Sequence, residues 1–331
     1  MRAKALTLLA LALVAGGCPA TRNALPTSAL ADGTPSTYLS LIYGVPPQGN
    51  VIQLRSSRNG ALVRRLASTQ DGISALRLRD GSVLIFTQSH KNHETTIDKI
   101  DVATGRERRL RVINDIAYSP AISPSQDQIA YTTYPTNYVQ TRLNAFLPFE
   151  LAVLNLTSGA RVSTDSDIGG HPFFNVVWSP DGRKLAVNYF GDTEGVVIMN
   201  AAHPEFRSAA RVENPRGCSY HVSSWTTDGL IGAQQCGKPY SQTGTRLVEF
   251  STKGRLLRSW ILPSCAIRAD AFPNKIQTAF IVSVPFGFGN GSCGRQWGLY
   301  TYELSRGRLR LVTEQRARVP KPELDPVPIG W

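Results

Sequence analysis

Long apolar stretches are missing from most of this 331-residue sequence, and nothing after the first twenty residues approaches the length that spans a bilayer. An integral membrane protein is therefore not expected. The sequence also lacks the G-x-S-x-G, H-E-x-x-H and P-loop motifs, and none of its five cysteines forms a C-x-x-C pair. From these absences we expect no catalytic residues, no metal site and no cofactor.

Acidic residues are scarce beside basic ones, with 24 Asp and Glu against 36 Lys and Arg, and most of the cations are arginine. A GC-rich genome produces such an arginine excess, so the net charge of +12 does not by itself indicate a nucleic-acid partner. Glycine (28) and proline (21) are abundant and evenly spread. This much turn chemistry predicts many short strands and an all-β fold.

The N-terminus has the features of an export signal. Arg2 and Lys4 precede a thirteen-residue apolar run, 5–17, which has the length of a signal-peptide core. The run ends at Cys18 in a pattern that resembles a bacterial lipoprotein box, whose cysteine is lipidated and becomes the new N-terminus. The competing interpretation is ordinary cleavage after an A-x-A site at 29–31, which would release a soluble secreted protein.

These features divide the chain into three predicted parts. They are a signal peptide over 1–17, a flexible tether over 18–36 that is rich in Pro, Ala, Ser and Thr, and a single folded domain over 37–331. We therefore expect an exported protein of the cell envelope that is anchored to a membrane through its lipid.

The folded part contains an internal repeat. Segment 176–190 (VVWSPDGRKLAVNYF) has the form of a strand, a tight polar turn and a second strand. The same form recurs at 75–88, 120–134, 222–236 and, more loosely, 269–283. Aligning the copies places the first residue of each turn at Leu78, Ser123, Ser179, Thr226 and Phe272.

A second turn marks the other half of most units. It occurs at Asn59-Gly60, Thr104-Gly105, Ser158-Gly159, Lys253-Gly254 and Arg306-Gly307. Each of these turns follows an alternating strand, such as ELAVLNL at 150–156. Four short antiparallel strands in a unit of about 46 residues are typical of a propeller blade.

The units add up to six blades, of which the first is incomplete. Its three predicted strands, within 38–67, lack an inner strand because the tether leads directly into them. The C-terminal segment 326–331 ends at Trp331, which stands where Trp178 and Trp225 stand in the repeat. We expect this segment to complete blade one and close a six-bladed propeller of four-stranded antiparallel blades.

The unit WSPDGRKLA at 178–186 resembles the repeat of TolB-type, WD-repeat-like six-bladed propellers, and weaker copies extend the likeness from about residue 37 to 331. Its Asp-Gly suits a hairpin turn, because glycine adopts positive φ without strain. The resemblance implies an exported bacterial propeller that binds other envelope components. TolB proteins carry a separate domain before the propeller, where this chain has only the tether, so the likeness does not extend to a Tol-system role.

Loop lengths predict which face of the propeller binds a ligand. With strands a to d running outward, the a–b and c–d turns form one face, the short-turn face, and we expect these turns to be uniformly short. The b–c and d–a loops form the other, loop-rich face, which carries most insertions and is therefore the expected binding face. Its candidate residues are His90, His93, Tyr138, Arg142, Tyr240, Phe286, Phe288, Arg295 and Trp297.

Aromatic rings beside arginines suit a protein, peptide or glycan ligand, because rings stack on apolar surfaces and arginine pairs with carboxylate or phosphate. The structural alternative for each of the phenylalanines is that it packs its own loop onto the blades.

Four cysteines lie in the folded part, the even number expected of disulfides in an oxidising compartment. Cys218 and Cys265 precede strand a of blades five and six, and Cys236 and Cys293 follow strand b of the same blades. We predict the disulfides Cys218–Cys236 and Cys265–Cys293. The sequence leaves open the alternative pairing Cys236–Cys265.

Arginines recur on the predicted outermost strands, within 64–65, 108–111, 207–211, 255–258 and 308–310. Because they encircle the rim, we interpret them as charges that prevent edge-to-edge strand pairing and not as a nucleic-acid site. Lipid headgroups near the anchor would attract them weakly.

Titratable residues also stand where strand a begins, close to the central channel in which propeller enzymes often place catalytic groups. These residues are Asp115, His171, His221, Asp270 and Asp325. No nucleophile accompanies them, so they support only the alternative function, a secreted hydrolase or lyase that acts on a glycan or peptide at the channel mouth.

The sequence thus predicts a monomeric, exported, lipid-anchored β-propeller. It would bind an envelope protein, peptide or glycan through its loop-rich face without catalysis, and it would contact the membrane through the anchor alone.

Overall fold

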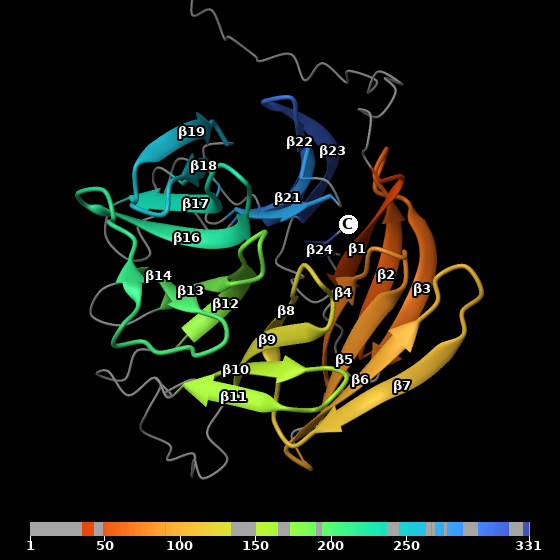
Figure 1. Cartoon of the computed structure of the whole chain (residues 1–331). Coiled ribbons are helices and arrows are strands. Elements are labelled where there is room, and N and C mark those ends of the chain that lie inside the picture. The colour runs from red at the N-terminus through yellow and green to blue at the C-terminus, as the bar shows by residue number, and fades with distance from the viewer. Residues whose placement is uncertain are drawn as a thin grey trace, which may run out of the picture. The chain divides into compact units, whose positions relative to one another are not determined.

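The computed structural model describes residues 35–42, 49–89, 91–133, 150–164, 173–189, 194–236, 245–262, 266, 269–274, 277–286, 297–317 and 327–330. Only the backbone is described at 285–286, 297–300, 313–317 and 327–330. Within these stretches every regular element is a β-strand, and the strands form six four-stranded antiparallel sheets in a ring (Figure 1). The predicted six-bladed all-β propeller is confirmed.

Each sheet is one blade, whose strands run from the innermost, strand a, to the outermost, strand d. Blade one contains β24 (Val327–Gly330), β1 (Thr37–Ile42), β2 (Asn50–Ser56) and β3 (Leu62–Thr69). Blade two contains β4 (Gly72–Arg77), β5 (Val83–Ser89), β6 (Glu94–Ile100) and β7 (Glu107–Ile113). Blade three contains β8 (Tyr118–Ile122), β9 (Gln128–Thr133), β10 (Glu150–Asn155) and β11 (Arg161–Thr164).

The second half of the ring has the same order. Blade four contains β12 (Phe173–Trp178), β13 (Lys184–Tyr189), β14 (Gly195–Asn200) and β15 (Ala210–Arg211). Blade five contains β16 (Cys218–Trp225), β17 (Leu230–Cys236), β18 (Arg246–Phe250) and β19 (Leu256–Trp260). Blade six contains β20 (Asp270–Pro273), β21 (Ala279–Phe286), β22 (Trp297–Ser305) and β23 (Arg308–Ala317).

The C-terminal strand closes the ring as predicted. β24 pairs antiparallel with β1, and Val327 lies opposite Leu41 while Gly330 lies opposite Leu39. Blade one therefore takes its innermost strand from the end of the chain and its other three strands from the beginning. Trp331, which the repeat places one residue further on, lies outside the described residues.

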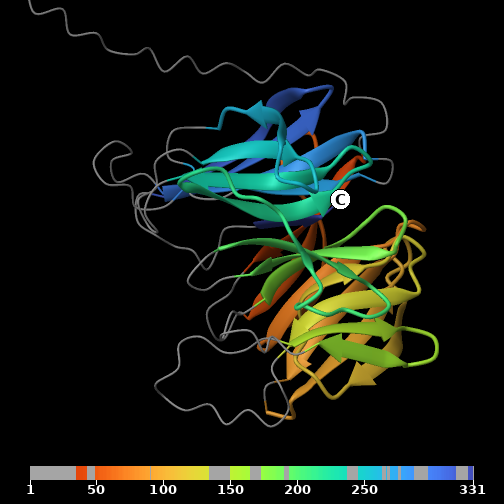
Figure 2. The same ribbon diagram turned by 60° about the vertical axis from the view of Figure 1, so that its left-hand side comes forward.

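The hydrophobic core lies between blades and not within any one of them, because each sheet buries both faces against its neighbours. One cluster joins Phe86 and Ile97 of blade two to Ile129 and Tyr131 of blade three. Figure 2 shows the sheets of neighbouring blades lying face to face. A blade removed from the ring would lose much of its buried apolar surface.

The c–d turns follow the predicted pattern in five blades. Their glycines all have positive φ: Gly60, Gly105, Gly159, Gly254 and Gly307. Blade four is the exception to the expected short turns. There β14 and β15 are joined by residues 201–209, and Phe206 in this connection is buried against Phe173, with ring centroids 5.3 Å apart. The longer connection covers the blade that has the shortest outer strand.

One predicted turn position was wrong. The a–b turn of blade six begins at Asn274, whose backbone N–H donates to Ala279 O at 2.8 Å, and not at Phe272. The alignment failed there because Phe272-Pro273 continues strand β20 for two further residues before the chain turns.

Arginine and tryptophan side chains link neighbouring blades at the c–d turns. Arg64 of β3 donates to Val102 O in blade two, and Arg310 of β23 donates to Ser57 O in blade one at 3.4 Å. Trp260 Nε1 of β19 donates to Gly307 O in blade six at 3.3 Å. Some rim arginines therefore hold the blades together, in addition to keeping the outer edges charged.

Candidate functional site

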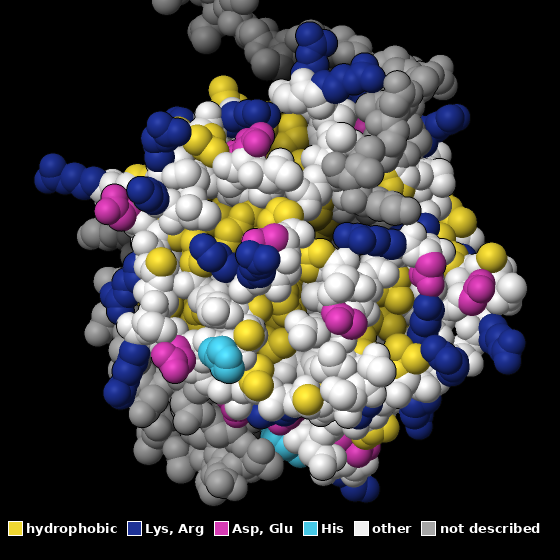
Figure 3. All heavy atoms as spheres, in the orientation of Figure 1, with side chains coloured by type: hydrophobic (Ala, Val, Ile, Leu, Met, Phe, Trp, Pro, Cys, Tyr) yellow, Lys and Arg dark blue, Asp and Glu magenta, His cyan; other side chains and the backbone are white. Residues whose placement is uncertain are grey.

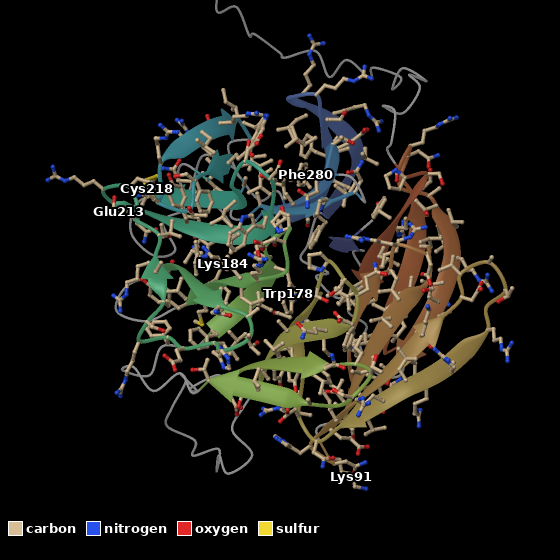
Figure 4. The ribbon with its side chains drawn as sticks, viewed as in Figure 1. Lys91, Trp178, Lys184, Glu213, Cys218 and Phe280 are labelled. Carbon is tan, nitrogen blue, oxygen red and sulfur yellow. A yellow bond between two sulfur atoms is a disulfide. The ribbon has the colours of Figure 1, made fainter. Side chains whose placement is uncertain are left out.

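The inner strands enclose a central channel of about 1100 Å³. Its walls come from strand a of blades two to six, β4, β8, β12, β16 and β20, and from the a–b turns that follow them. Leu41 and Asn50 add a contribution from blade one. In Figure 4, Trp178 lies near the middle of the ring, where β12 reaches the channel. A ligand in this channel would contact all six repeats.

One polar residue from each of blades two to six lines the channel at a similar position in the repeat. These residues are Ser74, Ser119, Asn175, Ser223 and Asp270, hereafter the polar ring. In blades three, four and five the residue lies in a β-bulge, where the register of strand a shifts. Bulges re-aim a side chain, and Ser119 and Asn175 adopt positive φ values of 46° and 49°. The backbone thus departs from regular pairing where it presents these groups.

Several polar atoms of the channel wall have no hydrogen-bond partner among the described residues. They are Ser74 Oγ, Ser224 Oγ and Gln277 Oε1. Ser224 is only 3% exposed, and buried hydroxyls in folded proteins are normally bonded. The charged groups among the described lining residues are Arg79 and Asp270. The channel wall therefore presents both signs of charge to a polar ligand.

Apolar side chains surround the polar ring on the side of the a–b turns. Trp178 and Trp225 end β12 and β16, and Phe272 lies in β20. Trp178 Nε1 donates to Ala121 O of blade three at 3.0 Å, which fixes the indole at the blade junction. Figure 3 shows hydrophobic side chains gathered about the centre of this view, with several Lys and Arg side chains among them and more toward the rim. Such a mouth suits a ligand that carries apolar groups next to polar ones.

Sequence reasoning named only Asp270 of the polar ring, although a signal for the other members exists. In blades two, three, four and six the ring residue stands four positions before the first residue of the a–b turn, and in blade five it stands three before. Placing the turn of blade six at Phe272 hid Asp270 from this alignment. The bulges were also not predictable from the residues in them, because serine and asparagine are just as common in turns that contain no bulge.

Most of the loop-rich face predicted from sequence cannot be placed. His90, Tyr138, Arg142, Tyr240, Phe288 and Arg295 lie outside the described residues. Phe286 ends β21 opposite Gly298, the neighbour of Trp297 in β22, so the backbone brings these two positions together. His93 has a φ of 54°, and its buried Nε2 has no partner among the described residues. Ligand binding by this face remains a prediction.

The disulfide predicted in blade five is present. Cys218 and Cys236 lie directly opposite each other on β16 and β17, with Cα atoms 4.0 Å apart. This pairing rules out the alternative Cys236–Cys265. Cys265 and Cys293 lie outside the described residues, so the second predicted disulfide is untested, as is lipidation of Cys18.

Asp115 does not stand at the channel mouth. Its carboxylate accepts hydrogen bonds from Tyr131 Oη at 2.7 Å and from Arg161 Nε at 2.9 Å, and Arg161 Nη2 also donates to Glu150 at 2.8 Å. Burial, followed by the charge of Asp115, raises the pKa of Tyr131. Asp115 thus belongs to a hydrogen-bonded network that links the strands of blade three, and the d–a loop turns its side chain outward between two sheets.

His221 contacts a carboxylate and a hydroxyl but does not form a catalytic relay. Its Nε2 lies 3.3 Å from Glu194 Oε2 and 3.3 Å from Ser219 Oγ. A Ser–His–acid triad needs the serine and the acid on different ring nitrogens, whereas both partners here meet the same one. The hydrogen bond from His221 lowers the pKa of Glu194. The arrangement is a hydrogen-bonded contact between blades four and five.

Of the other predicted channel groups, the structure describes only Asp270, which lines the channel as expected. His171 and Asp325 lie outside the described residues. Within the described stretches, no three His, Cys, Asp or Glu side chains cluster closely enough to hold a metal ion. The same stretches contain no helix of the length and apolarity that a membrane span requires.

No protein-family profile matches the sequence, and no curated protein is recognisably similar to it. Among solved structures the chain is similar to TolB from Acinetobacter baumannii, with 13% identity and a TM-score of 0.58 over 85% of this chain and 64% of that one. A TolB-type protein from Agrobacterium tumefaciens is 13% identical, with a TM-score of 0.53 over 88% of this chain and 97% of that one. An oligogalacturonate lyase in complex with manganese is 13% identical, with a TM-score of 0.54 over 84% of this chain and 73% of that one.

At these identities the comparisons establish the fold, a TolB-like six-bladed propeller. The chain spans less than two thirds of the Acinetobacter protein. The neighbours include both TolB proteins and a lyase, so the fold is common to proteins of different activity.

Proposed function

We propose that this chain is an exported binding protein that holds part of an envelope or extracellular protein, peptide or glycan in its central channel, without catalysis. The observation that carries the proposal is the polar ring inside an apolar mouth. Its members come from five different blades, and bulged backbone presents three of them. Strained or irregular backbone at a concave site is typical of ligand contact.

The two charged residues of the wall, Arg79 and Asp270, give the channel its selectivity. A ligand that pairs with Arg79 or Asp270 would form charge-assisted hydrogen bonds, each of which contributes about 1.5–3 kcal/mol. The loop-rich face would extend the contact on the opposite side of the propeller.

Export is supported by the Cys218–Cys236 disulfide, because disulfides persist in oxidising compartments. The apolar run at 5–17 and Cys18 support a lipid anchor in the cell envelope. Cleavage after the A-x-A site at 29–31 would instead give a soluble secreted protein. Intact-mass measurement of protein purified from its native envelope distinguishes the two, since only the first carries a diacylglyceryl mass on Cys18.

Site-specific photocrosslinking tests the binding proposal. A photoreactive phenylalanine replaces Thr227, an exposed channel-lining residue in the a–b turn of blade five, and in a control replaces Thr104 in the exposed c–d turn of blade two. We expect one recurrent adduct from position 227 alone, reduced several-fold by Arg79→Ala or Asp270→Asn with unchanged melting. Equal labelling from both positions, or an adduct indifferent to both substitutions, would contradict the proposal.

The alternative function is a secreted hydrolase or lyase at the channel mouth. The likeness to a lyase that binds manganese supports it, and Asp270 is the channel carboxylate that would take part. Incubating the purified chain with oligosaccharides or peptides, with and without manganese, tests for product. Turnover abolished by Asp270→Asn would favour the enzyme over the binding protein.

A further inference from the structure

A repeated ion pair joins the two outer strands in three blades. Arg109 Nε lies 3.2 Å from Asp98 in blade two, Arg258 Nε lies 3.4 Å from Glu249 in blade five, and Arg310 pairs with Glu303 in blade six. In each blade the two residues stand directly opposite each other in the register of strands c and d. The three carboxylates are buried, so each neutralises the arginine above it.

Blade one breaks this pattern. The residue opposite Arg65 is Gln53, which is as buried as the acids elsewhere, at 3% exposure, but carries no charge. Gln53 Oε1 instead accepts a hydrogen bond from Arg55 Nε at 3.1 Å. The sequence contains no Asp or Glu from residue 33 to residue 70, a span that includes four arginines. Among the described residues no ion pair reaches an arginine of blade one, so its outer edge is positively charged.

Exposed apolar side chains lie beside these cations. Leu62 and Val63, the first residues of β3, are 49% and 55% exposed, and Arg64 and Arg65 follow them directly. β3 is the outermost strand of its sheet, so its outer edge faces away from the ring. An edge strand that combines arginine with exposed Leu and Val has both components of a membrane-surface contact.

The neighbouring blade enlarges the positive surface. The hydrogen bond from Arg310 to Ser57 O holds the start of β23 against the c–d turn of blade one, which contains Arg58. Arg308, the first residue of β23, is exposed, as is Arg58. We call Arg58, Leu62, Val63, Arg65 and Arg308 together the blade-one edge.

We propose that the blade-one edge docks onto a bilayer surface of anionic lipid headgroups. The arginine guanidinium groups pair with lipid phosphates, and Leu62 and Val63 enter the boundary between headgroups and acyl chains. A soluble polyanion would match the charge but would leave the two apolar side chains in water. This contact is independent of the ligand proposed for the channel.

The position of the blade in the chain agrees with this surface. The described residues begin at Pro35, two residues before β1 of blade one, and Cys18 precedes Pro35 by seventeen residues. Seventeen residues reach at most about 60 Å when fully extended. A lipid on Cys18 would therefore keep blade one within reach of the membrane, and docking would add a second contact to the anchor.

Vesicle sedimentation tests the proposal with the full chain carrying Cys18→Ser, so that no acyl group contributes. The probes are vesicles of phosphatidylcholine alone and of equimolar phosphatidylcholine and phosphatidylglycerol. We expect binding to the second vesicle only, with a strong loss in roughly 0.5 M salt. Equal binding to both vesicles, or none to either, would overturn the proposal.

Two matched charge variants locate the surface. Arg58→Glu with Arg65→Glu and Arg308→Glu should lower partitioning by about a hundredfold, because each arginine near an anionic surface contributes about fivefold. The control makes the same charge change on exposed arginines of blade four and the following loop, with Arg183→Glu, Arg207→Glu and Arg216→Glu. An equal loss in the control would show that net charge alone attracts the protein.

A single substitution tests the missing ion pair. Gln53→Glu installs the acid that blades two, five and six carry opposite their arginine, so it should lower partitioning by about fivefold while leaving the melting temperature unchanged or higher. Because it adds a favourable pair, this variant keeps the test valid even if the triple variant fails to fold. Unchanged partitioning of Gln53→Glu would contradict a contribution of the positive charge of blade one to vesicle binding.

The apolar pair separates a membrane from a soluble polyanion. Leu62→Ser with Val63→Ser should remove the part of vesicle binding that survives high salt and should leave binding to heparin as it was. If the wild-type chain binds heparin as tightly as it binds vesicles, and the double variant changes neither, the partner is a polyanion in solution and the lipid proposal fails.

Discussion

Arg111 of blade two donates from Nη2 to the carbonyl oxygen of Leu156 in blade three, at 3.1 Å, and to that of Thr157, at 3.0 Å. The acceptors belong to the c–d turn that Gly159 completes with a φ of 78°. Arg64 makes the corresponding contact with the turn of blade two. Backbone carbonyls in a tight turn have few other partners, so the guanidinium both satisfies them and fixes the angle between adjacent blades.

Replacing Arg111 should therefore destabilise the propeller although it is not a core residue. We expect Arg111→Ala to lower the free energy of unfolding by about 1–3 kcal/mol, the range for hydrogen bonds to a charged group. Arg108→Ala is the control, because Arg108 is exposed on the same strand and has no such contact among the described residues. Equal denaturation midpoints for the two variants would mean that the contact contributes nothing.

Asn188 of β13 links blade four to β16 of blade five. Its side chain is fully buried, donates to Val222 O at 2.8 Å and accepts from Val222 N at 2.8 Å, so one amide replaces a strand partner across blades four and five. Asn188→Ala leaves both backbone groups unsatisfied and should cost about 2–4 kcal/mol by urea unfolding. The exposed Asn92→Ala should change the midpoint little.

The hydrogen bond between Glu194 and His221 predicts a dependence of stability on acid pH. The pKa of Glu194 is lowered from 4.5 by the hydrogen bond from His221, so the pair contributes stability that is full above pH 4.5 and is lost as the pH falls toward the folded-state pKa. The contribution is about 1 kcal/mol or less, because both side chains are partly exposed.

Melting curves of Glu194→Gln between pH 6 and pH 3 check this. The variant should be less stable than the wild type at pH 6 and should approach it at pH 3, whereas Glu205→Gln, an exposed change in the same blade, should follow the wild type throughout. A constant difference across the range would indicate lost packing and not lost charge.

The disulfide in blade five closes a loop with a sequence separation of 18 residues. On the chain-entropy model this contributes about 3 kcal/mol, so Cys218→Ser with Cys236→Ser should lower the free energy of unfolding by that amount, and a reducing agent should have the same effect on the wild type. Peptide mapping without reduction provides the direct check. It also shows whether Cys265 and Cys293 form the second predicted disulfide.

The fold was predictable because its signals repeat. Asp-Gly and similar turns recur in most blades, and the strands between them alternate, so the closing role of the C-terminal segment could be inferred from the incomplete first blade and the position of Trp331. Contacts between blades had no such signal. Whether Arg111 meets a turn of the next blade depends on the angle between sheets, which no single strand encodes.

The candidate site was harder to predict for a related reason. The polar ring combines residues that are far apart in the chain and ordinary in type, such as Ser74 and Asp270. Asp115 was placed at the channel from its position in the repeat, but its side chain turns toward Tyr131 and Arg161 instead. Side-chain direction at the start of a strand depends on the preceding loop, and loops are the least regular part of this sequence.

The pairing of β24 with β1 also sets the order in which the molecule can form. Val327 can pair with Leu41 only after nearly the whole chain has been synthesised. Contacts of such long sequence separation form slowly, because loop closure must precede the gain from pairing. Until then blade one lacks its inner strand and the ring stays open. The propeller therefore cannot close while its last strand is still being made.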